Sequence, residues 1–218
     1  MSSITKTDID NEVSKIKLCE EYYYPRNGRI KYYPEFVSEF NDFVLENVKN
    51  SGLWLEFGTF SGCTANYFSS KTENILHGFD TFRGVDVVEG SWDMRAWNRN
   101  GALPKVNENV NLVVGLFQDT LDNFLKEYTD PVSFLHVDCD IYSSTKFVLD
   151  TLYENNRIVK GTIILFDEIW RYSDYDKHEI LAWLQFVQKN NIKYEWIARS
   201  GPHNPPESVG QQAACVIL

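Results

Sequence analysis

The stretch LWLEFGTFSG, residues 53–62, decides the fold. Its first half is a short, continuous apolar run, and its second half is a turn that contains Gly58 and Gly62. The pattern of SGCTANYFSSK (61–71) then predicts a helix. An uninterrupted apolar run of this length is typical of a strand that is buried on both faces, as in parallel sheets.

The same unit recurs along the chain. Four further apolar runs, each ending at or just before a glycine or an acid, are ILHGF (75–79), NLVVG (111–115), VSFLHV (132–137) and TIILF (162–166). Helical patterns follow near 119–128, at 143–156 and at 178–190. Strands that alternate with helices predict a doubly wound α/β domain, with a mostly parallel sheet and helices on both faces. KYEWIA (193–198) and AACVIL (213–218) have no helix between them, so we expect the last strand to be antiparallel.

The chain divides into two parts by pattern. Residues 1–50 hold a polar start, a tyrosine-rich stretch at 21–36 and a helical pattern at 35–48, which predict a helical extension or cap. Residues 51–218 form the predicted catalytic domain. Within it, residues 81–106 show no strand pattern and contain two tryptophans and three arginines, as expected for an active-site lid.

Composition excludes several classes of protein. The 218 residues carry a formal net charge of −10, which disfavours nucleic acid as a partner. No apolar run approaches the length of a membrane span, and the polar N-terminus does not resemble a signal peptide. The four cysteines include no C-x-x-C pair, so we expect free thiols in a cytoplasmic protein and no zinc site. Whether the chain forms a homo-oligomer stays open.

Acidic side chains follow the predicted strands at one edge of the sheet. Ligands of open α/β sheets bind beyond the carboxyl ends of the strands. The residues expected at that edge are Glu56, Asp80, Gln118, Asp119, Asp138, Asp140, Asp167 and Glu168. Any one of these acids could simply cap a helix, and Asp119 is the best candidate for an N-cap. The convergence of five strand ends favours a binding site.

The first loop points to the kind of ligand. Its glycines have the spacing G-x-x-x-G, with Phe60 between them, which argues against the G-x-G-x-x-G loop of a nicotinamide-dependent oxidoreductase. Glu56 suits an amino group better than a phosphate, and Asp80 can accept hydrogen bonds from ribose hydroxyls. A nucleoside with a cationic, amino-bearing tail fits this edge, and S-adenosylmethionine is such a molecule.

Several motifs resemble those of class I S-adenosylmethionine-dependent methyltransferases. They are the E-x-G-x-x-x-G turn, the G-F-D after the second run and VGLFQDTL (114–121). FLHVDCDIYSSTK (134–146) and GTIILFDE (161–168) narrow the resemblance to the macrocin O-methyltransferase family, which methylates sugar hydroxyls on natural products. The resemblance covers about residues 54–179.

The resemblance implies a seven-stranded, Rossmann-like sheet and a set of site residues. The donor, which becomes S-adenosylhomocysteine, would lie near Glu56, Gly58, Thr59, Ser61, Gly62, Asp80, Gln118, Asp119 and Asp138. Gln118 would meet the adenine edge. Asp138, Asp167 and Glu168 match the acids that hold a divalent cation in metal-dependent members. Two departures are Glu168, where members often have a second Asp, and Thr59-Phe60-Ser61, where members often carry a basic residue.

The residues themselves also allow a metal site. If Asp138 and Asp167 end neighbouring strands, their backbones lie roughly 4.8 Å apart, and their carboxylates repel unless they are protonated or bridged by a cation. Oxygen ligands suit Mg²⁺ or another hard cation, which lowers the pKa of a bound hydroxyl. Alternatively, Asp167 caps the next segment and Asp138 holds the ammonium group of the donor, without a metal.

The histidines offer a candidate base. His178 follows the Asp167-Glu168 pair within an aromatic stretch, so it could take the hydroxyl proton, or it could be an exposed helix residue. His77 and His136 lie inside predicted strands. We expect His77 to pack in the core or at an edge, and His136 to be buried and hydrogen-bonded.

The sequence therefore predicts a transferase that moves a methyl group from S-adenosylmethionine to a hydroxyl of a small molecule or sugar, assisted by Mg²⁺, with Asp138 and His178 as catalytic residues. Two alternatives are a metal-independent methyltransferase acting on a carboxylate or nitrogen, and a non-catalytic nucleoside-binding module.

Overall fold

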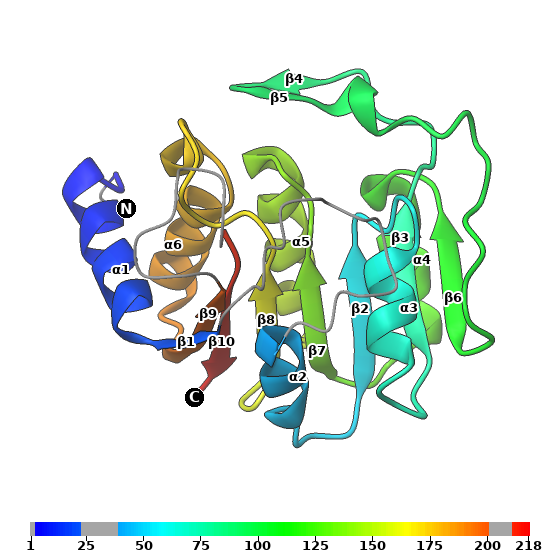
Figure 1. Cartoon of the computed structure of the whole chain (residues 1–218), viewed down its shortest axis with the longest axis horizontal. Coiled ribbons are helices and arrows are strands. Elements are labelled where there is room, and N and C mark those ends of the chain that lie inside the picture. Colours follow the sequence, from blue (N-terminus) through cyan, green and yellow to red (C-terminus); the bar gives the residue numbers. More distant parts are fainter. Residues whose placement is uncertain (1–2, 23–38, 201–210) are drawn as a thin grey trace.

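The computed structural model describes residues 3–22, 39–200 and 211–218. Its main sheet has eight strands in the order β1-β9-β10-β8-β7-β2-β3-β6 (Figure 1). The bounds of these strands are β1 (Glu20–Tyr22), β2 (Leu53–Phe57), β3 (Leu76–Asp80), β6 (Val110–Val114), β7 (Val132–Val137), β8 (Ile163–Phe166), β9 (Tyr194–Ser200) and β10 (Ala213–Ile217).

The strand directions match the prediction for this part of the chain. β2 pairs in parallel with β3 and β7, β3 with β6, and β7 with β8. β10 is antiparallel to both of its neighbours, β8 and β9. The chain runs from β2 outward through β3 to β6 and then returns to β7 on the other side of β2. The strand order therefore reverses between β2 and β7, which is where an open α/β sheet binds its ligand.

Helices cover both faces of the sheet. On one face lie α4 (Phe117–Glu127), α5 (Tyr142–Glu154) and α6 (Glu179–Asn190), with α1 (Lys6–Leu18) beside α6; on the other lie α2 (Glu39–Glu46) and α3 (Cys63–Ser69) (Figure 1). Because side chains alternate along a strand, Leu55 and Phe57 of β2 pack into one hydrophobic cluster while Trp54 packs into the other. Every residue of β2 is buried, as its continuous apolar run predicts.

The start of the chain is part of the main sheet and does not form a separate cap. β1 adds an eighth strand, parallel to β9, which the sequence prediction missed because Glu-Glu-Tyr is short and charged. The buried carboxylate of Glu12 on α1 accepts hydrogen bonds from Trp196 Nε1, at 2.6 Å, and from the hydroxyl of Tyr194. These bonds hold α1 against β9.

The segment 81–106 rises beyond the edge at which the parallel strands end (Figure 1). It contains a two-stranded hairpin, β4 (Val88–Glu89) with β5 (Trp92–Asp93), and a 3₁₀ turn, η1 (Met94–Trp97). The sequence prediction of no strand here was wrong for these four strand residues, which are too few to give a periodic pattern.

Two predicted features fall partly outside the described residues. The helix expected at 35–48 is seen as α2, while residues 35–38 and most of the tyrosine-rich stretch lie in the undescribed range 23–38. Residues 201–210, between β9 and β10, also lie outside the described residues. None of the helices in the described ranges combines the length and the apolar character that a membrane crossing requires.

Candidate active site

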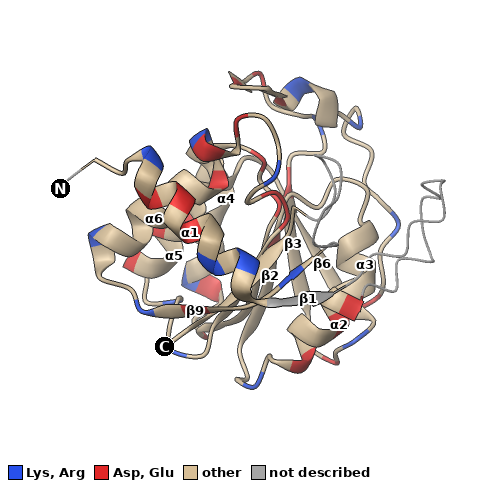
Figure 2. Cartoon of the chain, turned by 60° about the vertical axis from the view of Figure 1, so that its left-hand side comes forward, with Lys and Arg blue, Asp and Glu red and all other residues tan. Residues whose placement is uncertain are grey.

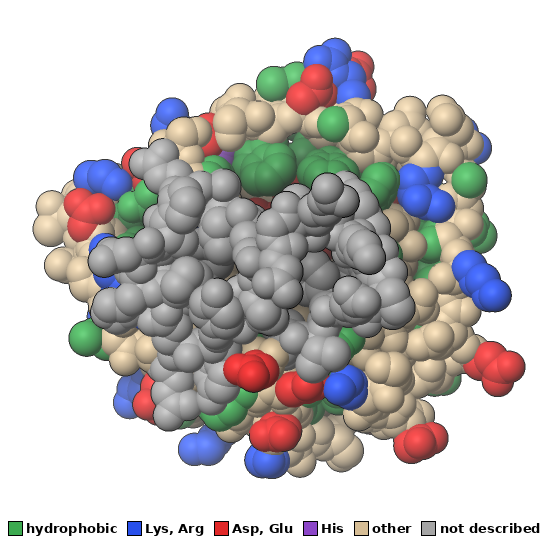
Figure 3. All heavy atoms as spheres, viewed as in Figure 1, with side chains coloured by type: hydrophobic (Ala, Val, Ile, Leu, Met, Phe, Trp, Pro, Cys, Tyr) green, Lys and Arg blue, Asp and Glu red, His purple; other side chains and the backbone are tan. Residues whose placement is uncertain are grey.

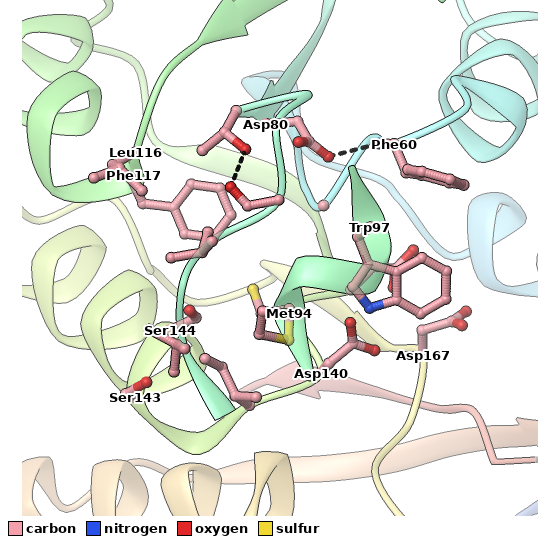
Figure 4. Close-up of a pocket in the computed structure, with 18 of the residues that line it drawn as sticks. Phe60, Asp80, Met94, Trp97, Leu116, Phe117, Asp140, Ser143, Ser144 and Asp167 are labelled. Atoms are coloured by element: carbon pink, nitrogen blue, oxygen red, sulfur yellow. Dashed lines mark hydrogen bonds between the residues drawn. The ribbon is translucent and has the colours of Figure 1, made fainter. Parts of the chain in front are cut away.

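The strand ends and the 81–106 segment enclose one cavity of about 300 Å³ (Figure 4). The loops beyond the strand ends carry acidic positions, coloured red in Figure 2. The lining residues from the sheet edge are Gly58, Phe60, Asp80, Thr81, Leu116, Phe117, Gln118, Asp138, Cys139, Asp140, Ile141, Asp167 and Glu168. Met94 and Trp97 of η1 project into it from the other side (Figure 4). Figure 3 shows hydrophobic side chains gathered below the hairpin on the face in view.

The turn after β2 is shaped by Gly58. Its φ is +102°, and a Cβ atom built there would lie 1.8 Å from the carbonyl oxygen of Asp138. A residue with a side chain would therefore strain the backbone and force the turns after β2 and β7 apart. The absence of that side chain allows the two loops at the switch point to touch.

Asp80, at the end of β3, organises the same turn. Its Oδ2 accepts the backbone N–H of Phe60 at 2.7 Å, and its Oδ1 accepts that of Phe82 at 2.6 Å. Phe60 has a positive φ of 39° and Phe82 one of 54°, so both amides are held in uncommon conformations. Burial raises the pKa of Asp80, although these amide bonds oppose the effect. Each carboxylate oxygen keeps a second lone pair that can accept a hydrogen bond from a ligand.

Three acids meet beyond β7 and β8. Asp138, Asp167 and Glu168 each offer a carboxylate oxygen, and the three oxygens lie within 4.8 Å of one another. Burial and the neighbouring charge of Asp167 raise the pKa values of Asp138 and Glu168 well above the ordinary range. Oε2 of Glu168 is buried and has no hydrogen-bond partner among the described residues. Crowded carboxylates with an unused buried oxygen are a donor set that fits a hard divalent cation.

A buried histidine adjoins this cluster. His136 on β7 is fully buried, with Nδ1 3.1 Å from Oε1 of Glu56 and Nε2 3.6 Å from Oδ1 of Asp167. Burial disfavours its charge, but the two carboxylates dominate and raise its pKa to about 10. Burial likewise opposes ionisation of Asp167, yet its interactions with His136, and then with Glu168 and Gln212, hold the pKa of Asp167 below its ordinary value. Of the three acids, Asp167 is therefore the one whose ionised form its surroundings favour.

The sequence matches the family described as methyltransferase domain over residues 55–169, just over half of the chain. The chain belongs to this methyltransferase family. No curated protein matches the sequence significantly.

Solved structures share the fold of this methyltransferase. The O-methyltransferase NovP is 18% identical with a TM-score of 0.56, over 80% of this chain and 78% of its own. CalS11, a TDP-rhamnose 3′-O-methyltransferase, is 18% identical with a TM-score of 0.52, over 99% and 96%. An O-methyltransferase from Bacillus cereus in complex with SAH is 14% identical with a TM-score of 0.53, over 99% and 92%. At these identities the likeness establishes the Rossmann-like fold of class I methyltransferases, with the seven expected strands in place.

The structure brings together six of the sequence-predicted site residues. Those that line the cavity of the methyltransferase are Gly58, Asp80, Gln118, Asp138, Asp167 and Glu168. Gln118 lies in the first turn of α4, beside Leu116 and Phe117. Both halves of the predicted site, donor loop and acid cluster, thus face one space.

The other predicted donor residues do not line the cavity. Glu56 is fully buried in β2, Thr59 is buried against Gly78, and Gly62 begins α3, where a Cβ would lie about 3 Å from Pro104 and Val106. Ser61 is also absent from the lining. Asp119 is exposed, and the N-cap position that we expected it to fill belongs to Leu116, so that expectation was wrong.

His178 lies in a different place from the cavity lining. It is buried at the start of α6, with Nε2 3.3 Å from Oδ2 of Asp174 and Nδ1 3.7 Å from Oε1 of Glu89 in the hairpin. The expectation of an exposed helix residue was wrong. His178 belongs to the contact between the 81–106 segment and the loop before α6.

Sequence reasoning noted Asp140 as a strand-end acid but did not place it in the site. Asp140 lines the cavity beside Trp97 (Figure 4), has a φ of +62°, and is buried. Burial, and then the charge of Asp167, raise its pKa to about 7. The D-C-D spacing at 138–140 was the available signal, because the turn after a strand can direct both acids to one side.

Proposed function

We propose that this methyltransferase transfers the methyl group of S-adenosylmethionine to a hydroxyl oxygen of a small molecule or sugar, with a divalent cation held by Asp138, Asp167 and Glu168. The observation that carries the proposal is the position of the three-carboxylate cluster in the same cavity as the loop after β2. The O-methyltransferases that share the fold support oxygen as the methyl acceptor.

The donor half of the cavity suits an adenosyl group. Asp80 is fixed by two backbone amides and can accept ribose hydroxyls. Leu116 and Phe117 offer apolar surface to a flat ring, and Gln118 can hydrogen bond to its edge. Bound S-adenosylmethionine supplies a methyl group on a positively charged sulfur. The chain's contribution is to align that methyl group with the attacking oxygen and to exclude water, for which Met94 and Trp97 cover the cavity.

The acceptor half has to make a weakly acidic hydroxyl reactive. A cation bound by the three carboxylates lowers the pKa of a hydroxyl that contacts it. Asp138 follows β7, the strand next to β2, and its backbone lies against Gly58, so this member of the cluster adjoins the donor loop. Its role is to hold the methyl donor and the acceptor in the relative orientation that the transfer requires.

Asp140 is the group that we assign to take the hydroxyl proton. It lines the cavity but is not one of the three clustered carboxylates, whereas His178 does not line the cavity. This assignment moves the base predicted from the sequence to a residue that lines the cavity.

A transfer assay tests the proposal. The protein is incubated with methyl-labelled S-adenosylmethionine, Mg²⁺ and a panel of glycosides, sugar nucleotides and small hydroxy compounds, and the labelled product is mapped by mass spectrometry. We expect label on oxygen, a loss of turnover of about 100-fold or more in Asp140→Asn, and a smaller loss in His178→Gln. Label on nitrogen or on a carboxylate, or a larger loss in His178→Gln than in Asp140→Asn, would overturn the assignment.

A further inference from the structure

Two neighbouring strands, β2 and β7, carry a buried polar pair, and Asp167 follows the next strand, β8. Glu56 on β2 and His136 on β7 are paired in register, and His136 stands beside Leu165 of β8. Both side chains are fully buried, in the layer where Phe68 of α3 contacts the imidazole edge to face, with ring centroids 5.0 Å apart. Such polar groups are costly to bury, so a sheet centre that keeps them has a use for them or compensates them internally.

The two ring nitrogens of His136 face two different carboxylates. Nδ1 is 3.1 Å from Oε1 of Glu56, which is a hydrogen bond. Nε2 is 3.6 Å from Oδ1 of Asp167, beyond a standard hydrogen bond, and it makes no other hydrogen bond among the described residues. The ring therefore links the strand that enters the donor loop to an acid of the cluster.

Asp167 is held from two sides through the same oxygen. Gln212, which precedes β10, donates its amide to Oδ1, and His136 faces Oδ1 as well. Both contacts are made to Oδ1 of Asp167, a residue that also lines the cavity. The orientation of Asp167 thus depends on groups behind it.

The geometry points to His136 as a positioning residue that orients Asp167 for the cation while Glu56 anchors the ring from the donor side. This inference rests on the proposed function, because it assumes that the cluster binds a divalent cation. It assigns Glu56 to the support of His136, in place of the contact with the donor's amino group that we expected from the sequence. Residues behind a ligating side chain commonly set its orientation and its affinity for metal.

Two substitutions separate the two ends of the ring. The amide nitrogen of Asn occupies roughly the place of Nδ1 and that of Gln the place of Nε2, so His136→Asn keeps the link to Glu56 and His136→Gln keeps the link to Asp167. His77→Asn is the matched control, because His77 is also a buried histidine and lies on β3, two strands away from β7. Its Nδ1 contacts Asn111, and neither residue lines the cavity. Folding of each variant is checked first by circular dichroism.

The readouts are Mn²⁺ affinity, from electron paramagnetic resonance, and S-adenosylhomocysteine affinity, from calorimetry. We expect His136→Asn to weaken Mn²⁺ binding about tenfold or more, and His136→Gln and His77→Asn to stay within about threefold of the wild type. S-adenosylhomocysteine affinity should stay within about threefold in all three. Equal Mn²⁺ affinities in the Asn and Gln variants, or a parallel loss of both affinities, would overturn the positioning role.

A measurement on the unmodified chain guards against a variant that fails to fold. The sequence has only four histidines, so ¹⁵N-histidine labelling gives a simple spectrum. The ring nitrogens of His136 should shift on saturation with Mg²⁺ and those of His77 should not; no shift at His136 would contradict the inference. If the wild type binds no Mn²⁺ while it still binds S-adenosylhomocysteine, the cation part of the proposed function fails and the inference fails with it. If the wild type binds Mn²⁺ but the His136 variants do not differ in Mn²⁺ affinity, only the inference fails and the proposed function stands.

Discussion

Ser91 donates both its backbone N–H and its hydroxyl to the carboxylate of Asp174, at 2.8 and 2.5 Å. Ser91 lies at the tip of the β4-β5 hairpin, and Asp174 lies in the loop between β8 and α6. Burial raises the pKa of Asp174, but the hydrogen bonds from Ser91, and then the interaction with His178, lower it to about 2. Next to this contact, the rings of Trp92 and Tyr172 pack edge to face, with their centroids 5.8 Å apart. The 81–106 segment, which we propose to be a lid, is thus fastened to the body of the protein at its tip.

The first prediction concerns this fastening. Asp174→Ala should release the hairpin and raise amide hydrogen exchange across residues 81–106, because Ser91 loses both of its acceptors. Asp93→Ala is the control, since Asp93 accepts hydrogen bonds from Arg95 within the 81–106 segment and does not tie that segment to the body. Exchange in 81–106 that is unchanged in Asp174→Ala, or equally raised in both variants, would show that Ser91 and Asp174 do not hold the lid.

The second prediction concerns ligands and the same segment. Met94 and Trp97 line the cavity, so bound donor and acceptor should add contacts and increase protection of residues 81–106 from exchange. The protein is compared alone and with S-adenosylhomocysteine plus an acceptor found in the transfer assay. Protection that is the same in both states would contradict a closing lid.

The third prediction is cation dependence. Treatment with EDTA should abolish turnover, and added Mg²⁺ should restore it, because the crowded carboxylates lose the charge that compensates them. Asp167→Asn should lose turnover by at least about 100-fold and keep most of its affinity for the donor, while Asp138→Asn should lose both. Full turnover of metal-free enzyme on its own acceptor would rule the cation out.

The fourth prediction is a pH dependence of stability that comes from His77. Its buried ring packs against Phe124 and Tyr128, and burial lowers its pKa to about 4. The unfolded chain binds a proton at this residue below about pH 6.5, and the folded chain does not until about pH 4. The unfolded state therefore binds more protons in that window, so stability should fall as the pH drops from 6.5 to 4.

Denaturant titrations at several pH values check this effect. In His77→Phe the loss of unfolding free energy between pH 6.5 and 4 should be smaller than in the wild type by part of one proton's linkage. Identical pH profiles of the two proteins would mean that the pKa of His77 does not change on folding.

The central sheet and its edge were predictable because they depend on local patterns. Apolar runs such as LWLEF are buried on both faces, and alternation of runs with helices fixes a parallel sheet. The acids after β3, β7 and β8 reach one cavity because parallel strands deliver their carboxyl ends to one edge. The position of Asp138 and Asp167 on neighbouring strands follows from the same rule.

The misplacements have a different physical origin. Glu56 is one residue before the end of β2, and alternation directs its side chain to His136 within the sheet layer, not into the loop. His178 was chosen because it follows the Asp167-Glu168 pair along the chain, but tertiary contact with the hairpin sets its position. Asp140 was noted only as a strand-end acid, and its positive φ is not visible in the sequence. β1 has no apolar pattern of its own and depends on β9 for its pairing.

The account rests most directly on binding of the adenosyl donor, and calorimetry with S-adenosylhomocysteine tests it. We predict one site per chain, and in Asp80→Ala a loss of about 1–3 kcal/mol of binding free energy, because a ligand hydroxyl is left without its acceptor. Asp119→Ala removes an exposed acid from the same edge and should bind as the wild type does. No heat and no thermal shift with the wild-type protein at millimolar S-adenosylhomocysteine would contradict the account.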